Sequence, residues 1–285
     1  MTPPALDAQA VARSIEAALA EDLGARGDIT SLAVVSSELR ARAHVVAREP
    51  LVVAGIPIAR GVFLRLDAGA RFPYAAEDGR RTTAGERVLT VEGRAIALLE
   101  GERTALNFLQ RLSGIATATA AAVQEIAGTG ARILDTRKTA PGLRLLDKYA
   151  VAVGGGTNNR IGLYDQAMIK DTHLGAAASL GDAVRACLSS GVPADAITAE
   201  VRNRRELEEA IAAGAGRAIL DNMSLDDLAA CVALGKGKIV LEASGGLRPG
   251  RLKAVAATGV DALSLGYLTH SVAAADLAMD LESLP

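Results

Sequence analysis

The carboxyl-terminal half of the chain alternates short β-rich runs with helical patterns, and this alternation limits the folds open to it. The β-rich runs lie at 132–135, 167–170, 196–201, 217–221, 238–243 and 261–265. Helical patterns lie at 177–190, 204–213, 224–234 and 249–258. Strands that alternate with helices of about ten residues predict a parallel sheet. The near-uniform spacing, and the lack of a GxGxxG fingerprint, favour an α/β barrel over a doubly wound sheet.

The amino-terminal half has a different pattern. A helix is predicted over 12–23, and strands are predicted at 41–48, 51–55 and 88–99, where Gly, Pro and Asp mark the turns. Residues 101–126 have the spacing of one long helical region, which Gly114 could interrupt. We therefore expect an α/β domain over residues 1–113, joined by residues 271–285, and a barrel domain over residues 114–270.

The composition narrows the class of protein. Half of the 285 residues are apolar and only 2% are aromatic, so the core must consist mainly of Ala, Val, Leu and Ile. A net charge of −2 argues against a nucleic-acid surface held by bulk electrostatics. The amino terminus lacks a signal-peptide pattern, and no apolar run approaches the ~18 residues that span a bilayer. We expect a cytoplasmic protein in which Cys187 and Cys231 are thiols rather than a disulfide or zinc site.

Charged residues stand at the ends of the predicted strands. They are Asp135, Arg137, Lys138, Lys170, Asp171, His173, Glu200, Asp221 and Glu242. In a (β/α) barrel, catalytic groups lie at the carboxyl ends of the strands. Charge at one such turn carries little information, but successive strands that end in charges of both signs predict one shared site.

The residue types at this site indicate an anionic sugar substrate. Arg137, Lys138, Arg160 and Lys170 form a cationic group suited to phosphate, pyrophosphate or carboxylate. Glu200 and Asp221 provide the oxygen ligands that hold Mg²⁺ or bind sugar hydroxyls. A ribose with a 5-phosphate and a Mg-bound pyrophosphate, together with an anionic co-substrate, satisfies the whole set. That sugar is phosphoribosyl pyrophosphate.

Glycine-rich stretches leave two readings open. Glycines in ASGGL and SLGYLTHS, after the last two strands, could bring backbone N–H groups to a phosphate or could form tight turns. The run GGG at 154–156 is either a phosphate-facing loop or the stop of a helix over LLDKYAVAV.

Longer motifs resemble a known family. DTRKTAPGLR, KYAVAVGGGTNNRIGLYDQAMIKDTH, ILDN, EASGGL, GYLTHS and EDLGARGDITS are similar to quinolinate phosphoribosyltransferases, in order and over nearly the whole chain. The resemblance implies Mg²⁺-dependent transfer of phosphoribosyl to quinolinate, with loss of pyrophosphate and CO₂, to give nicotinate mononucleotide for NAD synthesis. It also implies a homodimer or a higher homo-oligomer, whose subunits have an α/β domain packed on an open seven-stranded α/β barrel.

The resemblance assigns expected roles to individual residues. Arg137, Lys138, Arg160 and Lys170 would line the quinolinate and pyrophosphate region, and Arg103 would serve the partner subunit's site. Glu200 and Asp221 would lie near the ribose and the Mg²⁺, directly or indirectly, and act with Lys138 and Lys170 as the catalytic set. The residues expected on the phosphate side are Ser244, Gly245, Gly246, Gly266 and His270.

The chain departs from the family pattern at a few positions. Asn159 replaces the His of an N-H-R triplet, Thr198 replaces the first acid of E-V-E-V, and Thr172 replaces the Asn of Asp-Asn-His. An amide and a neutral imidazole each donate a hydrogen bond, but only His becomes cationic. If position 159 contacts a quinolinate carboxylate, Asn should weaken binding of the dianion rather than abolish it, so the acceptor stays open.

Two other functions fit part of the pattern. Lys170 at a strand end could form a Schiff base and make the protein an aldolase-type lyase. A relative with another acceptor, such as the molybdenum-transport-associated branch, or a non-catalytic relative is the second alternative. Borohydride trapping would test the first, and Mg²⁺-dependent binding of phosphoribosyl pyrophosphate would test the second.

Overall fold

A computed structural model describes residues 5–174 and 179–284 of the chain. The chain forms two compact units. Unit 1 contains the residues up to Ala120, then Thr139–Gly155, and the residues from Thr269 on. Unit 2 contains Ala121–Lys138 and Gly156–Leu268. The domain boundaries expected above, 1–113 with 271–285 and 114–270, remain a prediction.

Unit 2 is built on one parallel sheet of six named strands, in the order β6-β11-β10-β9-β8-β7. The strands are β6 (Arg132–Leu134), β7 (Ala167–Ile169), β8 (Ile197–Val201), β9 (Arg217–Asp221), β10 (Val240–Ser244) and β11 (Ala262–Ser264). They confirm the six β-rich runs read from the sequence. Beside β6, Thr157 forms a parallel bridge with Leu134, so one residue pair occupies the seventh strand position in the described residues.

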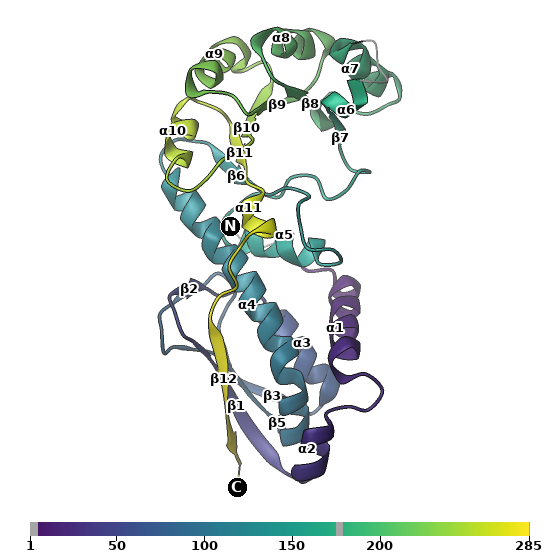
Figure 1. The fold of residues 1–285 in the computed structure, drawn as a ribbon, viewed down its shortest axis with the longest axis vertical. Helices are drawn as coiled ribbons and strands as arrows, with labels where there is room; N and C mark the ends of the chain where they lie inside the picture. The colour runs from purple at the N-terminus through teal and green to yellow at the C-terminus, as the bar shows by residue number, and fades with distance from the viewer. Residues whose placement is uncertain (1–4, 175–178, 285) are drawn as a thin grey trace. The chain divides into compact units, whose positions relative to one another are not determined.

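Helices follow the strands along the outer side of this curved sheet (Figure 1). They are α6 (Asp171–Leu174), α7 (Leu180–Ser189), α8 (Arg204–Ala213), α9 (Leu225–Gly235) and α10 (Leu252–Ala257), with a 3₁₀ turn, η1, at Ala194–Ala196. Ser179, Asn203 and Ser224 each accept a backbone N–H three residues on and begin α7, α8 and α9. These caps explain why the predicted helices fit the observed ones, although residues 177 and 178 lie outside the described residues.

Unit 1 is built on an antiparallel sheet in the order β12-β1-β5-β3. Its strands are β1 (Arg40–Ala47), β3 (Arg71–Ala75), β5 (Arg87–Arg94) and β12 (Leu277–Ser283), and β2 (Leu51–Val52) pairs separately with β4 (Arg81–Thr82). Every second residue of β1, from Ala41 to Ala47, is buried, so one face of the sheet forms core. The predicted strand over 51–55 ends at Val52.

The helices of unit 1 correct one expected strand. They are α1 (Ala8–Leu23), α2 (Ile29–Val34), α3 (Ile56–Leu66), most of α4 (Ala95–Glu125) and α5 (Arg144–Val153); the short α11 (Tyr267–His270) crosses the boundary between the units. The predicted strand over 88–99 is wrong beyond Arg94, where α4 begins. The segment from Ala95 to Leu99 is made of strong helix formers with one Ile, and Ala95, Ala97 and Leu98 are buried.

Two glycine questions have structural answers. Helix α4 runs through Gly114 without a break, and the glycine is needed there for packing, because a Cβ at this position would meet the carbonyl oxygen of Ala273 at 2.2 Å. The run 154–156 stops α5: Gly154 donates its N–H to Ala150, and Gly155 takes a φ of +88°.

Among the described residues, no helix combines the length and the apolar character needed to cross a membrane. The cytoplasmic location remains a prediction.

Candidate active site

The carboxyl ends of the barrel strands bring Lys170 and Glu200 into contact. Ile169 pairs in register with Ala199, so the next residues, Lys170 and Glu200, lie side by side. Lys170 Nζ lies 3.0 Å from Glu200 Oε2, and the two side chains are 42% and 14% exposed. The ammonium group is therefore placed by a carboxylate while it still faces solvent.

The backbone at this strand end is fixed by His173, one of the strand-end residues from which the sequence predicts a shared site. His173 accepts the N–H of Lys170 on Nδ1 at 3.0 Å. His173 thus orients the turn that carries Lys170.

Arg160 and Arg137 form the cationic part of the site. Arg160 donates to the Gln166 carbonyl at 3.1 Å and to Met168 Sδ at 3.3 Å, which places its guanidinium beside β7. Burial, and the charge of Arg137, lower the pKa of Arg160. Two guanidinium groups close enough to repel each other provide a planar, bidentate site for a carboxylate or a phosphate.

Asp221, at the end of β9, lies beside Ser244, at the end of β10, in the register of the sheet. The next residue, Asn222, takes a φ of +54°, donates its N–H to Ser244 at 2.9 Å and donates its amide to Asp221 at 2.9 Å. A Cβ on Gly245 would come within 2.3 Å of the Asn222 amide oxygen. The turn itself therefore requires Gly245, whatever it binds.

Two acids expected at strand ends are buried instead. Glu242 lies within β10 and is 1% exposed; it accepts hydrogen bonds from Ser264 and from Arg217 at 3.3 Å. Burial raises the pKa of Glu242, against the effect of these partners. Asp135 is fully buried after β6. Sequence patterns gave Arg217 no role; its partly exposed guanidinium lies 3.3 Å from the buried Glu242 carboxylate and forms an ion pair with it.

The remaining predicted residues are placed as follows. Lys138 is exposed, and its N–H donates to Thr136 Oγ1 at 3.1 Å. Gly246, with a φ of +60°, follows Gly245, and Gly266 follows β11. Arg103, exposed on α4, and His270, exposed at the end of α11, belong to unit 1.

The acids of unit 2 fit an oxygen-ligated cation only in part. Glu200 and Asp221 lie on the neighbouring strands β8 and β9, and their carboxylates are the ligands that Mg²⁺ prefers. The described residues contain no group of three or more His, Cys, Asp or Glu side chains placed to hold a metal. A magnesium ion here would take its other oxygens from water and substrate, as Mg²⁺ commonly does.

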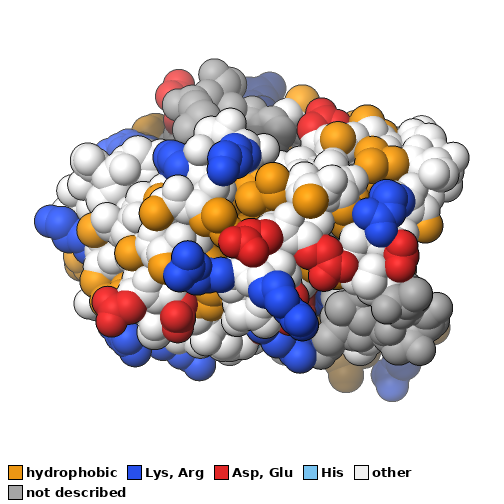
Figure 2. Space-filling model, turned by 90° about the horizontal axis from the view of Figure 1, so that it is seen from above, with side chains coloured by type: hydrophobic (Ala, Val, Ile, Leu, Met, Phe, Trp, Pro, Cys, Tyr) orange, Lys and Arg blue, Asp and Glu red, His pale blue; other side chains and the backbone are white. Residues whose placement is uncertain are grey.

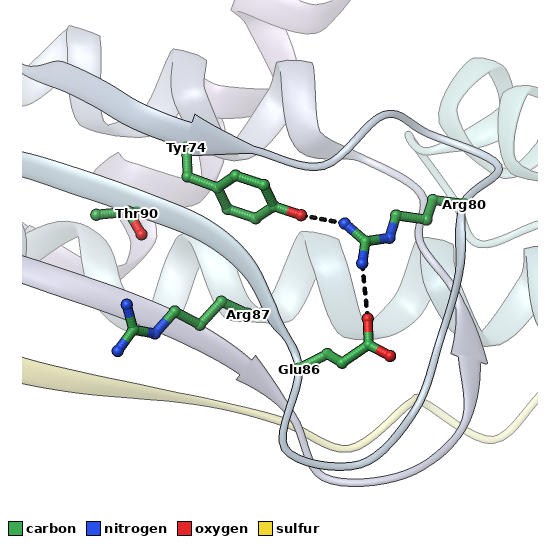
Figure 3. Close-up of a pocket in the computed structure, with 5 residues that line it drawn as sticks. All are labelled: Tyr74, Arg80, Glu86, Arg87 and Thr90. Atoms are coloured by element: carbon green, nitrogen blue, oxygen red, sulfur yellow. Dashed lines mark hydrogen bonds and ion pairs between the residues drawn. The ribbon is translucent and has the colours of Figure 1, made fainter.

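A cavity of about 400 Å³ lies in unit 1, and no residue predicted for the site lines it. Tyr74, Arg80, Glu86, Arg87 and Thr90 line it (Figure 3). Arg80 donates to the Tyr74 hydroxyl and forms an ion pair with Glu86 at 2.7 Å. The Arg80 guanidinium is thus already bound to side chains of the cavity wall, and its charge is balanced by Glu86.

Figure 2 shows one face of the molecule, on which basic and acidic side chains lie interspersed among hydrophobic ones. A nucleic-acid surface gathers Lys and Arg on one face or along one helix. The mixed charge of this face agrees with the net charge of −2.

Comparisons with known proteins agree over most of the chain. The models for the N-terminal and C-terminal domains of quinolinate phosphoribosyl transferase match residues 28–113 and 115–280. The chain is 42% identical to a probable nicotinate-nucleotide pyrophosphorylase (carboxylating) of Bacillus subtilis, covering 92% of this chain and 90% of that protein. It is also 42% identical to the nicotinate-nucleotide pyrophosphorylase (carboxylating) of Mycobacterium leprae, covering 94% and 96%.

Solved structures show the same similarity. The nicotinate-nucleotide pyrophosphorylase of Francisella tularensis is 37% identical and superposes with a TM-score of 0.92, covering 98% of each chain. That of Ehrlichia chaffeensis is 38% identical with a TM-score of 0.90, covering 95% of this chain and 98% of the other. The chain belongs to the quinolinate phosphoribosyl transferase family.

Proposed function

We propose that the protein transfers the phosphoribosyl group of phosphoribosyl pyrophosphate to quinolinate and releases pyrophosphate and CO₂. The product is nicotinate mononucleotide, a precursor of NAD. The observation that carries the proposal is the cationic group at the strand ends of unit 2, where Arg160 is close enough to Arg137 to feel its charge. The ion pair between Lys170, which follows β7, and Glu200, near the end of β8, belongs to the same sheet.

Arg137 and Arg160 are suited to bind the two carboxylates of quinolinate. Each guanidinium offers a planar pair of N–H donors, and a bound dianion would relieve the repulsion between the two groups. The contacts of Arg160 to Gln166 and Met168 leave the side chain little freedom to lose on binding. In this arrangement the pyridine nitrogen is oriented by its neighbouring carboxylate.

The transfer step forms a bond between the pyridine nitrogen and the anomeric carbon as the bond to pyrophosphate breaks. The nitrogen carries no proton, so the step needs no general base. Negative charge grows on the departing pyrophosphate, and Lys138 and Lys170 are the cations that neutralise it. Glu200 holds Lys170 in place at 3.0 Å until the pyrophosphate competes for the ammonium.

Glu200 and Asp221 would hold a magnesium ion, directly or through water. When bound, Mg²⁺ supplies positive charge to the pyrophosphate oxygens. The same two carboxylates can accept hydrogen bonds from ribose hydroxyls, and each of them lies in or at the end of a strand rather than on a loop.

Loss of CO₂ follows from the product of the transfer step. Once the ring nitrogen is bonded to ribose, the ring is a pyridinium. The bond from the ring carbon to the carboxylate breaks, the electron pair stays with the ring, and a proton takes the vacated position. The guanidinium groups that bind the dianion also hold this carboxylate relative to the ring.

Two observations bear on the alternatives. A Schiff-base lysine must be desolvated or lie beside another cation to lose its proton, whereas Lys170 is 42% exposed and paired with a carboxylate. A different acceptor stays testable, because Asn159 stands where a cationic His would favour a dianion.

The working assembly in this proposal is a homodimer, in which Arg103 of each subunit serves the site of the other. Arg103 is exposed on α4, as a residue lent to a partner must be. Closed two-fold dimers are the commonest assemblies of identical chains.

The test offers the purified protein phosphoribosyl pyrophosphate and Mg²⁺ with either quinolinate or nicotinate, and follows the mononucleotide. Turnover of quinolinate alone supports the proposal. Turnover of nicotinate alone, or of neither acid while phosphoribosyl pyrophosphate still binds, would assign the protein another acceptor. Borohydride trapping with a carbonyl substrate serves as the control for a Schiff base.

A further inference from the structure

Asp135 is a charged residue that the proposed mechanism does not use. It follows β6 directly, and its side chain is fully buried. A buried carboxylate costs free energy unless its oxygens accept hydrogen bonds. The groups that donate hydrogen bonds to the Asp135 carboxylate therefore indicate its structural role.

The Asp135 carboxylate binds the loop that follows α5. Oδ2 accepts a hydrogen bond from Asn158 Nδ2 at 2.6 Å, and Oδ1 accepts one from the backbone N–H of Asn159 at 2.8 Å. The backbone adds to this contact, because the Thr157 N–H donates to Ile133 at 2.8 Å and the Asp135 N–H donates to Thr157 at 3.3 Å. The end of β6 and the start of the loop thus form one hydrogen-bonded unit.

Arg160 follows directly in this loop. The Asn159 side-chain oxygen accepts the Arg160 N–H at 2.9 Å. Further along, the Asp165 carboxylate accepts the N–H groups of Ile161 and Gly162 at 2.7 and 2.9 Å. Hydrogen bonds to Asp135 and to Asp165 therefore fix the backbone on both sides of Arg160.

We propose that Asp135 is a positioning residue: it fixes the backbone at Asn158 and Asn159 so that the Arg160 guanidinium is held for the acceptor's carboxylate. This inference rests on the proposed function. A bidentate contact tolerates little displacement, and a misplacement of about 1 Å can cost about 100-fold in rate. Asp135 acts mainly on the acceptor half of the site, whereas Lys170, in the pyrophosphate half, is held by its own contact with Glu200.

The experiment compares Michaelis constants for the two substrates. Asp135→Ala should raise the KM for quinolinate by about 10-fold to 100-fold, because the loop loses two hydrogen bonds that place Arg160. The KM for phosphoribosyl pyrophosphate should rise much less, because Lys170 is held by its own ion pair with Glu200 at 3.0 Å. A purely structural role would lower the melting temperature without separating the two constants.

A matched control is Asp261→Ala. Asp261 accepts the Leu241 N–H at 2.9 Å and pairs with Lys236 at 2.6 Å, but it stands before β11, at the opposite end of that strand. Its loss should lower stability and leave both Michaelis constants close to those of the unmodified protein.

A reciprocal exchange tests the hydrogen bond itself. In the double variant Asp135→Asn/Asn158→Asp, the introduced amide can donate to the introduced carboxylate and still accept the Asn159 N–H. We expect it to recover most of the quinolinate affinity that Asp135→Ala loses. It also covers the case in which Asp135→Ala does not fold.

Each outcome has a separate meaning. No turnover of quinolinate by the unmodified protein overturns the proposed function and this inference with it. If the unmodified protein turns over quinolinate normally, two results overturn the positioning role alone. One is an unchanged quinolinate KM in Asp135→Ala. The other is an equal rise of both Michaelis constants in Asp135→Ala and in the double variant.

Discussion

Arg160 and Lys170 are both cations whose side chains are held in place by other residues of the protein. Arg160 is held by the Gln166 carbonyl and the Met168 sulfur, and Lys170 is held by Glu200. Charges fixed before the substrate arrives need not be reorganised during the reaction, which is where electrostatic catalysis gains most. The predictions at the scale of single residues concern such preorganised groups.

Lys138→Ala should lower kcat by about 10²–10³-fold, the usual loss when one preorganised contact to developing charge is removed. Because Lys138 is exposed, the melting temperature should not change. Lys253→Ala, which removes an exposed lysine of α10, is the control and should leave both quantities unaltered. Near-normal turnover in Lys138→Ala would remove this residue from the catalytic set.

Asn159→His should strengthen quinolinate binding, and more so at pH 6 than at pH 8. An imidazolium adds positive charge beside the dianion, whereas the amide of Asn159 does not titrate. Steady-state KM values for quinolinate at the two pH values test this. A variant whose KM has the same pH dependence as that of the unmodified protein would show that position 159 does not contact the acceptor.

Glu242 predicts a pH effect on stability. Burial raises its pKa above the ordinary 4.5, so its contribution to stability is full below pH 4.5 and is lost as the pH rises through the folded-state pKa. Glu242→Gln does not titrate. Its free energy of unfolding, measured with urea from pH 4.5 to 8, should therefore improve relative to the unmodified protein as the pH rises. A constant or falling difference would show that Arg217 and Ser264 fully compensate the buried charge.

At the scale of helices and strands, a buried ion pair joins two helices of unit 1. Arg111 of α4 binds both oxygens of Asp147 of α5, at 2.8 and 2.7 Å, and Asp147 is completely buried. Asp147 also accepts the Ala140 N–H at 3.0 Å, and Arg111 also donates to the Thr269 carbonyl at 3.1 Å. One pair thus fastens the two helices to the segments at 140 and 269.

Arg111→Ala should cost about 3–5 kcal/mol in the free energy of unfolding, because it leaves the Asp147 charge buried without its partner. Chemical denaturation measures this loss. The control is Arg65→Ala, which breaks a pair with Glu16 that lies mostly in solvent and should change stability little. Equal losses in the two variants would contradict the difference between buried and exposed pairs.

Sequence patterns located most elements of unit 2 because three kinds of signal agreed there. Apolar runs marked the strands, helical periodicity filled the intervals, and Ser or Asn caps began α7, α8 and α9. In unit 1 such agreement was rarer. Strand β12, with the sequence LAMDLES, has large apolar residues at every second position over only seven residues, and no strand was predicted there; its pairing with β1 fixes its conformation.

The candidate site was predictable to the extent that it depends on topology. Parallel strands bring their carboxyl ends to one edge, so the proximity of Lys170 and Glu200 follows from the order of the strands. Whether an acid near such an end is exposed depends on the packing around it, which the pattern does not encode. Asp135 and Glu242 are both buried for this reason, and each holds neighbouring polar groups instead of facing solvent.

At the scale of the whole molecule, the proposed dimer makes a prediction that a monomer cannot satisfy. Arg103→Ala and Lys138→Ala should each be nearly inactive. If Arg103 serves the partner's site, mixed dimers contain one intact site, and an equal mixture after exchange of subunits should recover about a quarter of the normal activity. A mixture as inactive as its components would place Arg103 and Lys138 in the same subunit's site, or would leave Arg103 outside the site.

The central claim is that one active site joins quinolinate to the phosphoribosyl group and removes CO₂. The most direct measurement uses quinolinate labelled in the carboxylate next to the ring nitrogen, and counts labelled CO₂, pyrophosphate and nicotinate mononucleotide from the same reaction. We predict that the three products form in equal amounts and only when phosphoribosyl pyrophosphate is present. Pyrophosphate without labelled CO₂, or turnover that needs no quinolinate, would contradict the account.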